Sequence, residues 1–216
     1  GGASGAYDEE VPTAYEQVSD GNDTVSNKVG DFMDNNSVMY TSPTFDLMGA
    51  SVTAHLGYAP QASDTAVGDG GSVTYSESIG SGKEAGLTIA YEGLKLGVYG
   101  AERDRTVPQV AGATGMYETD EFNGSWYAKY SFGPVSVGYS EFYFDAGVTS
   151  GVQTVNAAVT HRTGGGIFTG DQMSIAFNVN DNMSISYTTS DETYDNQDDA
   201  KTAAVSYTHL TLPTRS

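Results

Sequence analysis

The sequence has no cysteine, few basic residues and no long hydrophobic run, and each absence narrows the possibilities. Without cysteine among its 216 residues, the chain can form neither disulfides nor thiolate metal sites. Nine lysines and arginines stand against 28 aspartates and glutamates, a net charge of −19, so we expect no nucleic-acid partner. No run of about 18 apolar residues occurs, so the sequence predicts no membrane-spanning helix.

Stretches of alternating apolar and small polar residues recur along the chain, and this period of two is typical of β-strands. The predicted strands cover residues 37–42, 49–59, 85–92, 94–105, 122–132, 135–144, 170–179, 183–190 and 202–207. Tight turns are expected at SPTFDL, EGL, FGP and NDN, and long connections at 60–84, 106–121, 145–169 and 191–201. Because short and long connections alternate, the sequence predicts an all-β antiparallel up-and-down meander.

Each predicted strand has one apolar face and one face of small, polar or basic residues. Two architectures fit this alternation: a membrane barrel whose apolar side chains face lipid, and a soluble sandwich that buries them. Aromatic residues near the strand ends and strands about ten residues long favour the barrel, because such barrels carry aromatic girdles around an apolar band about 25 Å tall. The barrel places on its convex side Leu96, Val98, Ile175, Phe177 and Ile185.

One stretch, DNNSVMYTSPTFDLMGASVTAHLGYAP at residues 34–60, resembles Gram-negative general porins. The matching residues are Asn36, Ser37, Val38, Tyr40, Ser42, Pro43, Phe45 and Tyr58. In that family the stretch follows the constriction loop, and a strand descends, turns at Ser-Pro and returns as a second strand. The later segments at 127–143 and 173–192 are similar in texture to porin hairpins, the second especially to porins of marine alphaproteobacteria. The family's usual glycine and phenylalanine after the turn are replaced here by Asp46-Leu47-Met48-Gly49.

The resemblance implies a division of the chain into three parts. Residues 1–34 correspond to the loop that folds into the barrel and narrows the pore, and residues 35–207 carry about nine strands of a sixteen-stranded transmembrane barrel. The chain opens on GGASGAYDEE as if inside a longer protein, so we expect the first strands and the closing strand to be missing. Residues 208–216 break the pattern and resemble translated adapter sequence, so we expect them to be non-native and to extend no regular ladder.

The resemblance also implies a function in the bacterial outer membrane. A barrel of about sixteen strands encloses a water-filled channel for passive diffusion of small hydrophilic solutes and ions, and general porins act as homotrimers surrounded by lipid and lipopolysaccharide. Small inward residues are expected to keep the lumen wide, namely Thr53, Gly57, Gly97, Gly138, Ser174 and Ser186.

Charge at the narrowest point sets the selectivity of such a channel. In the loop-like segment the candidate constriction residues are Asp8, Glu9, Glu10, Glu16, Asp20 and Asp23. In general porins such carboxylates oppose basic wall residues, and strand parity points four into the lumen here, Lys95, Arg103, Arg105 and Lys129. The acidic excess predicts a preference for cations. An ordinary solvated loop and loop-neutralising charge near the rim are the corresponding alternatives.

Catalytic and metal-binding interpretations find little support. The three histidines, at positions 55, 161 and 209, lie in unrelated contexts, so the sequence predicts no metal site, no cofactor and no enzyme activity. The segment GSGKE at 80–84 departs from a phosphate-binding loop at two positions, where Glu77 and Glu84 stand. The alternative function is a secreted, acidic, β-rich surface protein of adhesin type, which would share the acidity and the lack of cysteine.

Overall fold

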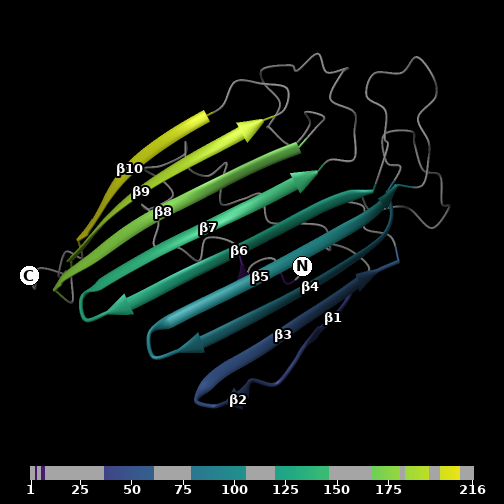
Figure 1. The fold of residues 1–216 in the computed structure, drawn as a ribbon, viewed down its shortest axis with the longest axis horizontal. Coiled ribbons are helices and arrows are strands. Elements are labelled where there is room, and N and C mark those ends of the chain that lie inside the picture. Colours follow the sequence, from purple (N-terminus) through teal and green to yellow (C-terminus); the bar gives the residue numbers. More distant parts are fainter. Residues whose placement is uncertain are drawn as a thin grey trace, which may run out of the picture.

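The computed structural model describes residues 3, 6–7, 37–60, 79–105, 120–145, 167–180, 183–194 and 200–209, with side chains for all of these except 105, 168, 192, 194 and 200–209. These residues form a single ten-stranded sheet (Figure 1). The strands are β1 (Val38–Thr41), β2 (Phe45–Leu47), β3 (Ala50–Ala59), β4 (Ile79–Tyr91), β5 (Leu94–Arg105), β6 (Glu121–Phe132), β7 (Val135–Asp145), β8 (Ile167–Asn180), β9 (Met183–Tyr194) and β10 (Ala200–His209). Within the described ranges, no helix has the length and apolarity needed to cross a membrane.

The sheet is an up-and-down meander. From β3 to β10 each strand pairs with the next one along the chain, and all pairings are antiparallel. Both β1 and β2 pair with β3, so the ten strands occupy nine positions across the sheet. This confirms the predicted all-β arrangement of nine antiparallel strands. The described strands all lie in one open sheet, so they do not form the two-layer sandwich that the alternation also allowed.

The expected turn at Ser42-Pro43 is instead a bulge in the edge of the sheet. Thr41 pairs with His55 and Phe45 pairs with Val52, so the edge spends one more residue than β3 between these pairs. Ser42 keeps the edge attached, because its backbone N–H donates to the Ala54 carbonyl and its Oγ accepts from the Ala54 N–H, both at 2.9 Å. Proline has no N–H to offer a ladder, and a bulged edge is where a sheet tolerates it.

The true turn of this hairpin lies at Met48-Gly49. Both residues have positive φ, 55° and 87°, and Glu92-Gly93 repeats the pattern between β4 and β5 with 42° and 87°. Two consecutive positive φ values define the type I′ turn, whose twist suits a two-residue hairpin. The predicted EGL and FGP turns are therefore confirmed, and the SPTFDL turn is corrected by about five residues. The turn residues of NDN, 181–182, lie outside the described residues.

Several strands are longer than the alternation pattern suggests. β4 begins at Ile79, inside the predicted 60–84 connection, and β9 continues to Tyr194. The added residues include glycines and charges that carry no hydrophobic period, so only pairing with the neighbouring strand reveals them. β10 also extends the ladder into the segment excluded from fold reasoning, because Thr208 pairs with Ser184 and His209 with Met183. The expectation that no ladder forms there is wrong for these two residues, and 210–216 lie outside the described ranges.

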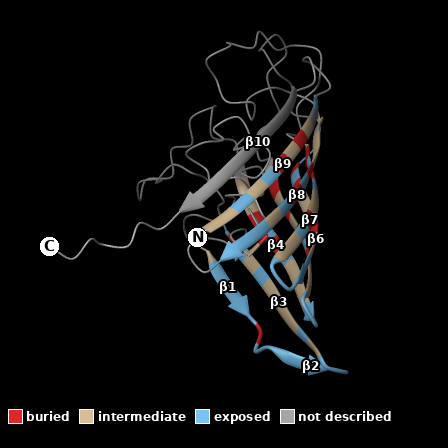
Figure 2. Ribbon diagram, turned by 90° about the vertical axis from the view of Figure 1, so that its left-hand side faces the viewer, coloured by how far each residue is buried: buried red, intermediate tan, exposed pale blue. Residues whose placement is uncertain are grey.

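The sheet is curved and its two faces differ. Figure 2 shows β1 and β9 on the same side of β6 and β7, so the central strands form the back of a shallow trough. Large apolar side chains on the convex face are exposed, among them Val98 at 53 %, Ile175 at 48 % and Phe177 at 44 %. The concave face carries the most buried side chains, including Tyr99 and Tyr127. An apolar face in contact with solvent and a polar buried face are the reverse of a water-soluble domain.

Candidate functional site

The concave face is lined by polar and aromatic side chains from β3 to β9. Its buried polar and charged residues are Glu84, Arg103, Glu121, Asn123, Gln172, Ser174, Thr188 and Ser190. Each of them alternates along its strand with a residue of the convex face, so strand parity places them together. We treat this face as the candidate functional surface, because polar residues gather there rather than on the opposite side.

A cluster around Glu84 joins two residues near the start of the chain to this face. The Glu84 carboxylate accepts hydrogen bonds from the backbone N–H of Ala3, at 2.8 Å, and from the hydroxyl of Tyr99, at 2.6 Å. Tyr7 stacks on Tyr99 with ring centroids 5.1 Å apart, and its hydroxyl lies 2.6 Å from Nδ1 of His55. Burial, and secondly the charge of Glu84, raise the pKa of the Tyr7 phenol well above its usual range.

Glycines make room for this cluster. A Cβ atom at Gly86 would lie 2.2 Å from the Tyr7 hydroxyl oxygen, and one at Gly57 would lie 2.4 Å from Oε1 of Glu84. Both contacts are far too short for real atoms, so glycine is required at each place. Glycine inside a strand often marks such a close approach. This is the one sequence signal from which the cluster was predictable, and our sequence analysis did not use it.

Two expected lumen glycines therefore do not leave open space. Gly57 lies under Glu84, and a Cβ at Gly97 would be 2.2 Å from Cε1 of Tyr127. Gly97 and Tyr127 are register partners on β5 and β6, so the ring of one strand covers the bare backbone of the next. The prediction that these two glycines widen the lumen is wrong, because neighbouring side chains fill the volume they leave.

Arg103 lies on the concave face as parity predicts, and it is engaged in an ion pair. Its Nη2 lies 2.7 Å and 2.8 Å from the two carboxylate oxygens of Glu121, its register partner on β6. The two side chains are only 11 % and 3 % exposed. A charge so closely compensated adds little to the field in the trough, so Arg103 contributes mainly to holding β5 and β6 together.

Lys95 and Lys129 also lie on the concave face, where they are direct register partners. Both are half-buried, and Nζ of Lys95 lies 5.6 Å from the centroid of the Tyr127 ring. A cation over an aromatic face is stabilised by the ring quadrupole. Like charges directly opposite each other are unfavourable in a sheet. The structure thus brings together two of the four predicted wall bases, in a part of the face near the β4–β5 and β6–β7 turns.

The remaining predicted site residues are not all within the described part of the chain. Asp8, Glu9, Glu10, Glu16, Asp20 and Asp23 lie outside the described residues, and so does the side chain of Arg105. Their roles remain predictions. Sequence reasoning missed Tyr7, Glu84, Tyr99 and Glu121, although their polar contacts organise the described face.

Three side-chain atoms on the concave face lack a hydrogen-bond partner. They are Oγ of Ser125, Nε2 of Gln172 and Oγ of Ser174. Gln172 and Ser174 are only 1 % and 3 % exposed. An unsatisfied buried polar atom costs about 1–3 kcal/mol, so such atoms are normally met by water or a polar solute. These atoms mark the middle of β8 as a place suited to polar molecules.

The boundary of the apolar band on the convex face follows an oblique line. Register partners share a face, so each ladder row can be read across the strands. In one row, apolar Tyr58 on β3 is followed by Lys83 on β4 and Glu102 on β5. Tyr58 is 52 % exposed, and Lys83 binds Glu102 at 2.9 Å, so both lie at the surface.

A second row, four residues nearer the turns, crosses the same boundary farther along the sheet. Leu87 and Val98 on β4 and β5 are followed by Trp126 on β6. The row then continues as three carboxylates, Glu141, Asp171 and Asp191, on β7, β8 and β9. The change from apolar to charged thus moves from between β3 and β4 to between β6 and β7.

One group of carboxylates on the convex rim has the spacing of a metal site. Within the described residues, only Glu102, Asp104 and Asp120 bring ligand oxygens within 4.8 Å of one another. Lys83 already binds Glu102, and Ser81 donates a hydrogen bond to Asp104. Two of the three carboxylates therefore have protein partners, and we assign no metal to the group.

The chain was also compared with known proteins. No protein-family model matches it, and no curated protein matches it. The resemblance of residues 34–60 to general porins therefore stays a prediction, and the functional argument has to come from the two faces of the sheet.

Proposed function

We propose that this chain forms part of the wall of an outer-membrane channel of the general porin type. The channel passes small hydrophilic solutes and ions by passive diffusion and has no catalytic role. The single observation that carries the proposal is the oblique limit of the apolar band on the convex face. The polar concave face, with its unpartnered atoms at Ser125, Gln172 and Ser174, supports it independently.

The oblique limit has a simple geometric meaning. Between the Tyr58 row and the Leu87 row the boundary moves four residues along the strands while it crosses three strand spacings. These steps correspond to about 13 Å along the strands and about 14 Å across them. The strands are therefore tilted by about 40° to the normal of the apolar band, and transmembrane barrels tilt their strands by about 35–45°.

The alternative, a secreted surface protein, has to explain the exposed apolar face. Val98, Ile175 and Phe177 are 44–53 % exposed, and neighbouring strands continue the same surface. In water, a contiguous apolar surface of this kind would drive aggregation. In a lipid bilayer it is stabilising, so the convex face favours the channel over the adhesin.

The preference for cations depends on the acidic segment before β1. On the described concave face Lys95, Lys129 and Arg103 are accompanied by Glu84 and Glu121, so the wall itself is close to balanced. The proposed selectivity therefore rests on the carboxylates between Asp8 and Asp23. Screening over a Debye length of about 8 Å at physiological salt leaves their field effective across a narrow pore.

Planar-bilayer recording of the intact protein tests the proposal. We expect single-channel steps, and a zero-current potential in a salt gradient that indicates cation selectivity. Changing Asp8, Glu9 and Glu10 to Asn and Gln together should move that potential toward anion selectivity. A matched triple change on the convex rim, Glu102→Gln, Asp104→Asn and Asp120→Asn, should leave it unchanged. Absence of channel steps would refute the porin function, and equal effects of the two triple changes would refute the assignment of the loop residues.

A further inference from the structure

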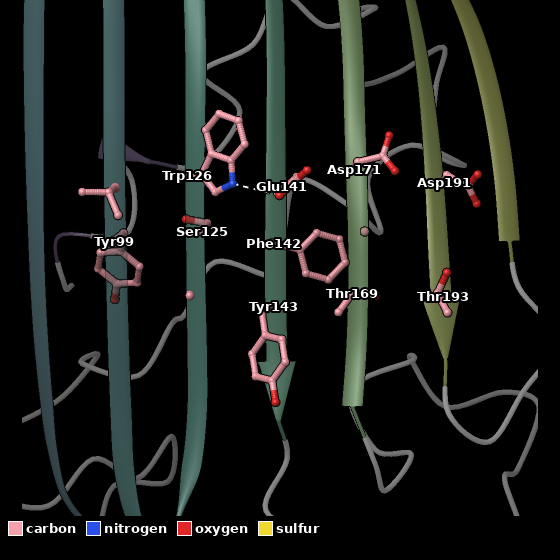
Figure 3. A pocket seen from close by; sticks show the side chains of 13 residues that line it. Tyr99, Ser125, Trp126, Glu141, Phe142, Tyr143, Thr169, Asp171, Asp191 and Thr193 are labelled. Atoms are coloured by element: carbon pink, nitrogen blue, oxygen red, sulfur yellow. Dashed lines mark hydrogen bonds between the residues drawn. The ribbon is translucent and has the colours of Figure 1, made fainter.

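Two adjoining hollows lie on the convex face of β6 to β9. The upper one, shown in Figure 3, has a volume of about 500 Å³ and is flanked by Trp126 and Tyr143. Glu141, Asp171 and Asp191 stand side by side in it on three neighbouring strands. The lower one has a volume of about 520 Å³, and its lining is almost entirely apolar. Its walls include Leu94, Tyr130, Tyr139, Met173, Ile175 and Tyr187.

The two hollows are continuous along the strands. Met173, in the lower hollow, lies two residues from Asp171 on the same face of β8, and Tyr139 lies two residues from Glu141 on β7. Side chains two apart on one strand are neighbours on the same face. A molecule that fills both hollows would therefore have one polar end and one apolar end.

The upper hollow is built to hold a positive charge. Both oxygens of Glu141 accept hydrogen bonds, Oε2 from Nε1 of Trp126 at 2.9 Å and Oε1 from the hydroxyl of Tyr139 at 2.6 Å. Donors on both oxygens orient the carboxylate and favour its ionised form. Asp171 is the register partner of both Glu141 and Asp191, and like charges so placed repel unless a cation lies between them. Lys201 on β10, the next residue of this row, is the register partner of Asp191.

We propose that the two hollows together bind one lipid whose headgroup ends in a primary ammonium. The ammonium lies among Glu141, Asp171 and Asp191, and the acyl chain lies in the lower hollow. The Trp126 ring adds an aromatic wall of the kind that attracts ammonium groups. Thr169 and Thr193 offer hydroxyl groups to the polar linker of the lipid. This inference rests on the proposed function, which puts the limit of the apolar band at the lipid–water interface.

A single metal ion fits the upper hollow less well. Among the described carboxylates, only the separate group at Glu102 has oxygens close enough to share one ion, and the row in the upper hollow does not belong to it. An ammonium group needs no such convergence, because its three N–H donors can reach separate acceptors. Charge and shape together therefore favour an amine-bearing amphiphile.

The test is lipid retention by the intact protein. Purified in detergent with an equimolar mixture of phosphatidylethanolamine and phosphatidylglycerol, the protein is analysed by native mass spectrometry with and without a chelator. We expect phosphatidylethanolamine to be retained about fivefold over phosphatidylglycerol, the factor expected of one partly exposed ion pair. Glu141→Gln combined with Asp171→Asn should bring the ratio near one. Glu102→Gln, a carboxylate of the same face outside the hollows, should leave it at fivefold.

Three results would overturn the inference: equal retention of the two lipids, a preference unchanged by the double substitution, or retention of phosphatidylglycerol that the chelator abolishes. The last would assign the carboxylates to a metal ion that bridges to lipid phosphate. Bilayer recording of the same preparations separates this inference from the channel function. Normal conductance without a lipid preference overturns the lipid site alone, whereas loss of conductance in the unmodified protein overturns the channel.

Discussion

The buried ion pair between Arg103 and Glu121 allows the most quantitative prediction. Replacing Glu121 with Gln leaves the guanidinium of Arg103 in a site that is only 11 % exposed, without the charge that compensates it. At an effective dielectric constant of about 20, unit charges about 3.5 Å apart attract by about 5 kcal/mol. Part of this is offset because the amide still accepts a hydrogen bond. We expect Glu121→Gln to lower the free energy of unfolding by about 3 kcal/mol, the lower end of the range for breaking a buried pair.

The measurement is a urea titration of the intact protein reconstituted in lipid vesicles, followed by tryptophan fluorescence. Lys83 and Glu102 supply the matched control, because they form a cross-strand pair of similar length, 2.9 Å, with side chains 64 % and 36 % exposed. Glu102→Gln should cost less than about 1 kcal/mol, as exposed pairs do. Replacing Arg103 with Met and Glu121 with Leu together should recover most of the lost stability. Equal losses for Glu121→Gln and Glu102→Gln would refute the role given to burial.

Three further predictions concern the packing and hydrogen bonds of the sheet. Gly97→Ala should destabilise the protein by about 1–3 kcal/mol, since its Cβ would meet the Tyr127 ring; adding Tyr127→Ser should relieve the loss in the same urea titration, and no relief would contradict the steric explanation. Ser42→Ala should cost about 1 kcal/mol because the Ala54 N–H loses its acceptor, and faster amide hydrogen exchange at residue 54 is the direct readout. Since the pKa of Tyr7 is raised in the folded protein, its neutral form contributes fully below about pH 10, the ordinary value, and stability falls at higher pH; Tyr7→Phe should remove the highest-titrating phenol from an absorbance titration, and an unchanged titration curve would show that Tyr7 is not buried against Glu84.

Strand identity and facing could be read from the sequence because a period of two is a local property. Leu96 and Val98 alternate with Lys95 and Gly97, and any sheet that buries or covers one face must place these two sets apart. The same reasoning put Arg103 and Lys129 on the concave face, where the structure places them. Turns at Glu92-Gly93 and Gly133-Pro134 were also predictable, because their positive φ values select glycine locally.

Other features depended on partners that are distant in the sequence. Ser42-Pro43 has the composition of a turn, yet it forms a bulge because Ala54, twelve residues later, supplies both a donor and an acceptor to Ser42. Glu84 lies in a stretch without any hydrophobic period, and only the approach of Ala3 and Tyr99 makes it the centre of a buried cluster.

The sequence by itself determined the all-β class, the meander and the separation of an apolar from a polar face, since these follow from composition and from a period of two. The tertiary structure alone decided the register between strands. Register is what sets Arg103 against Glu121, lays the Tyr127 ring over Gly97 and aligns Glu141 with Asp171. It also reveals the oblique limit of the apolar band. A single sequence cannot specify how far one strand slides past the next, because that choice is made by the sum of contacts between side chains on neighbouring strands.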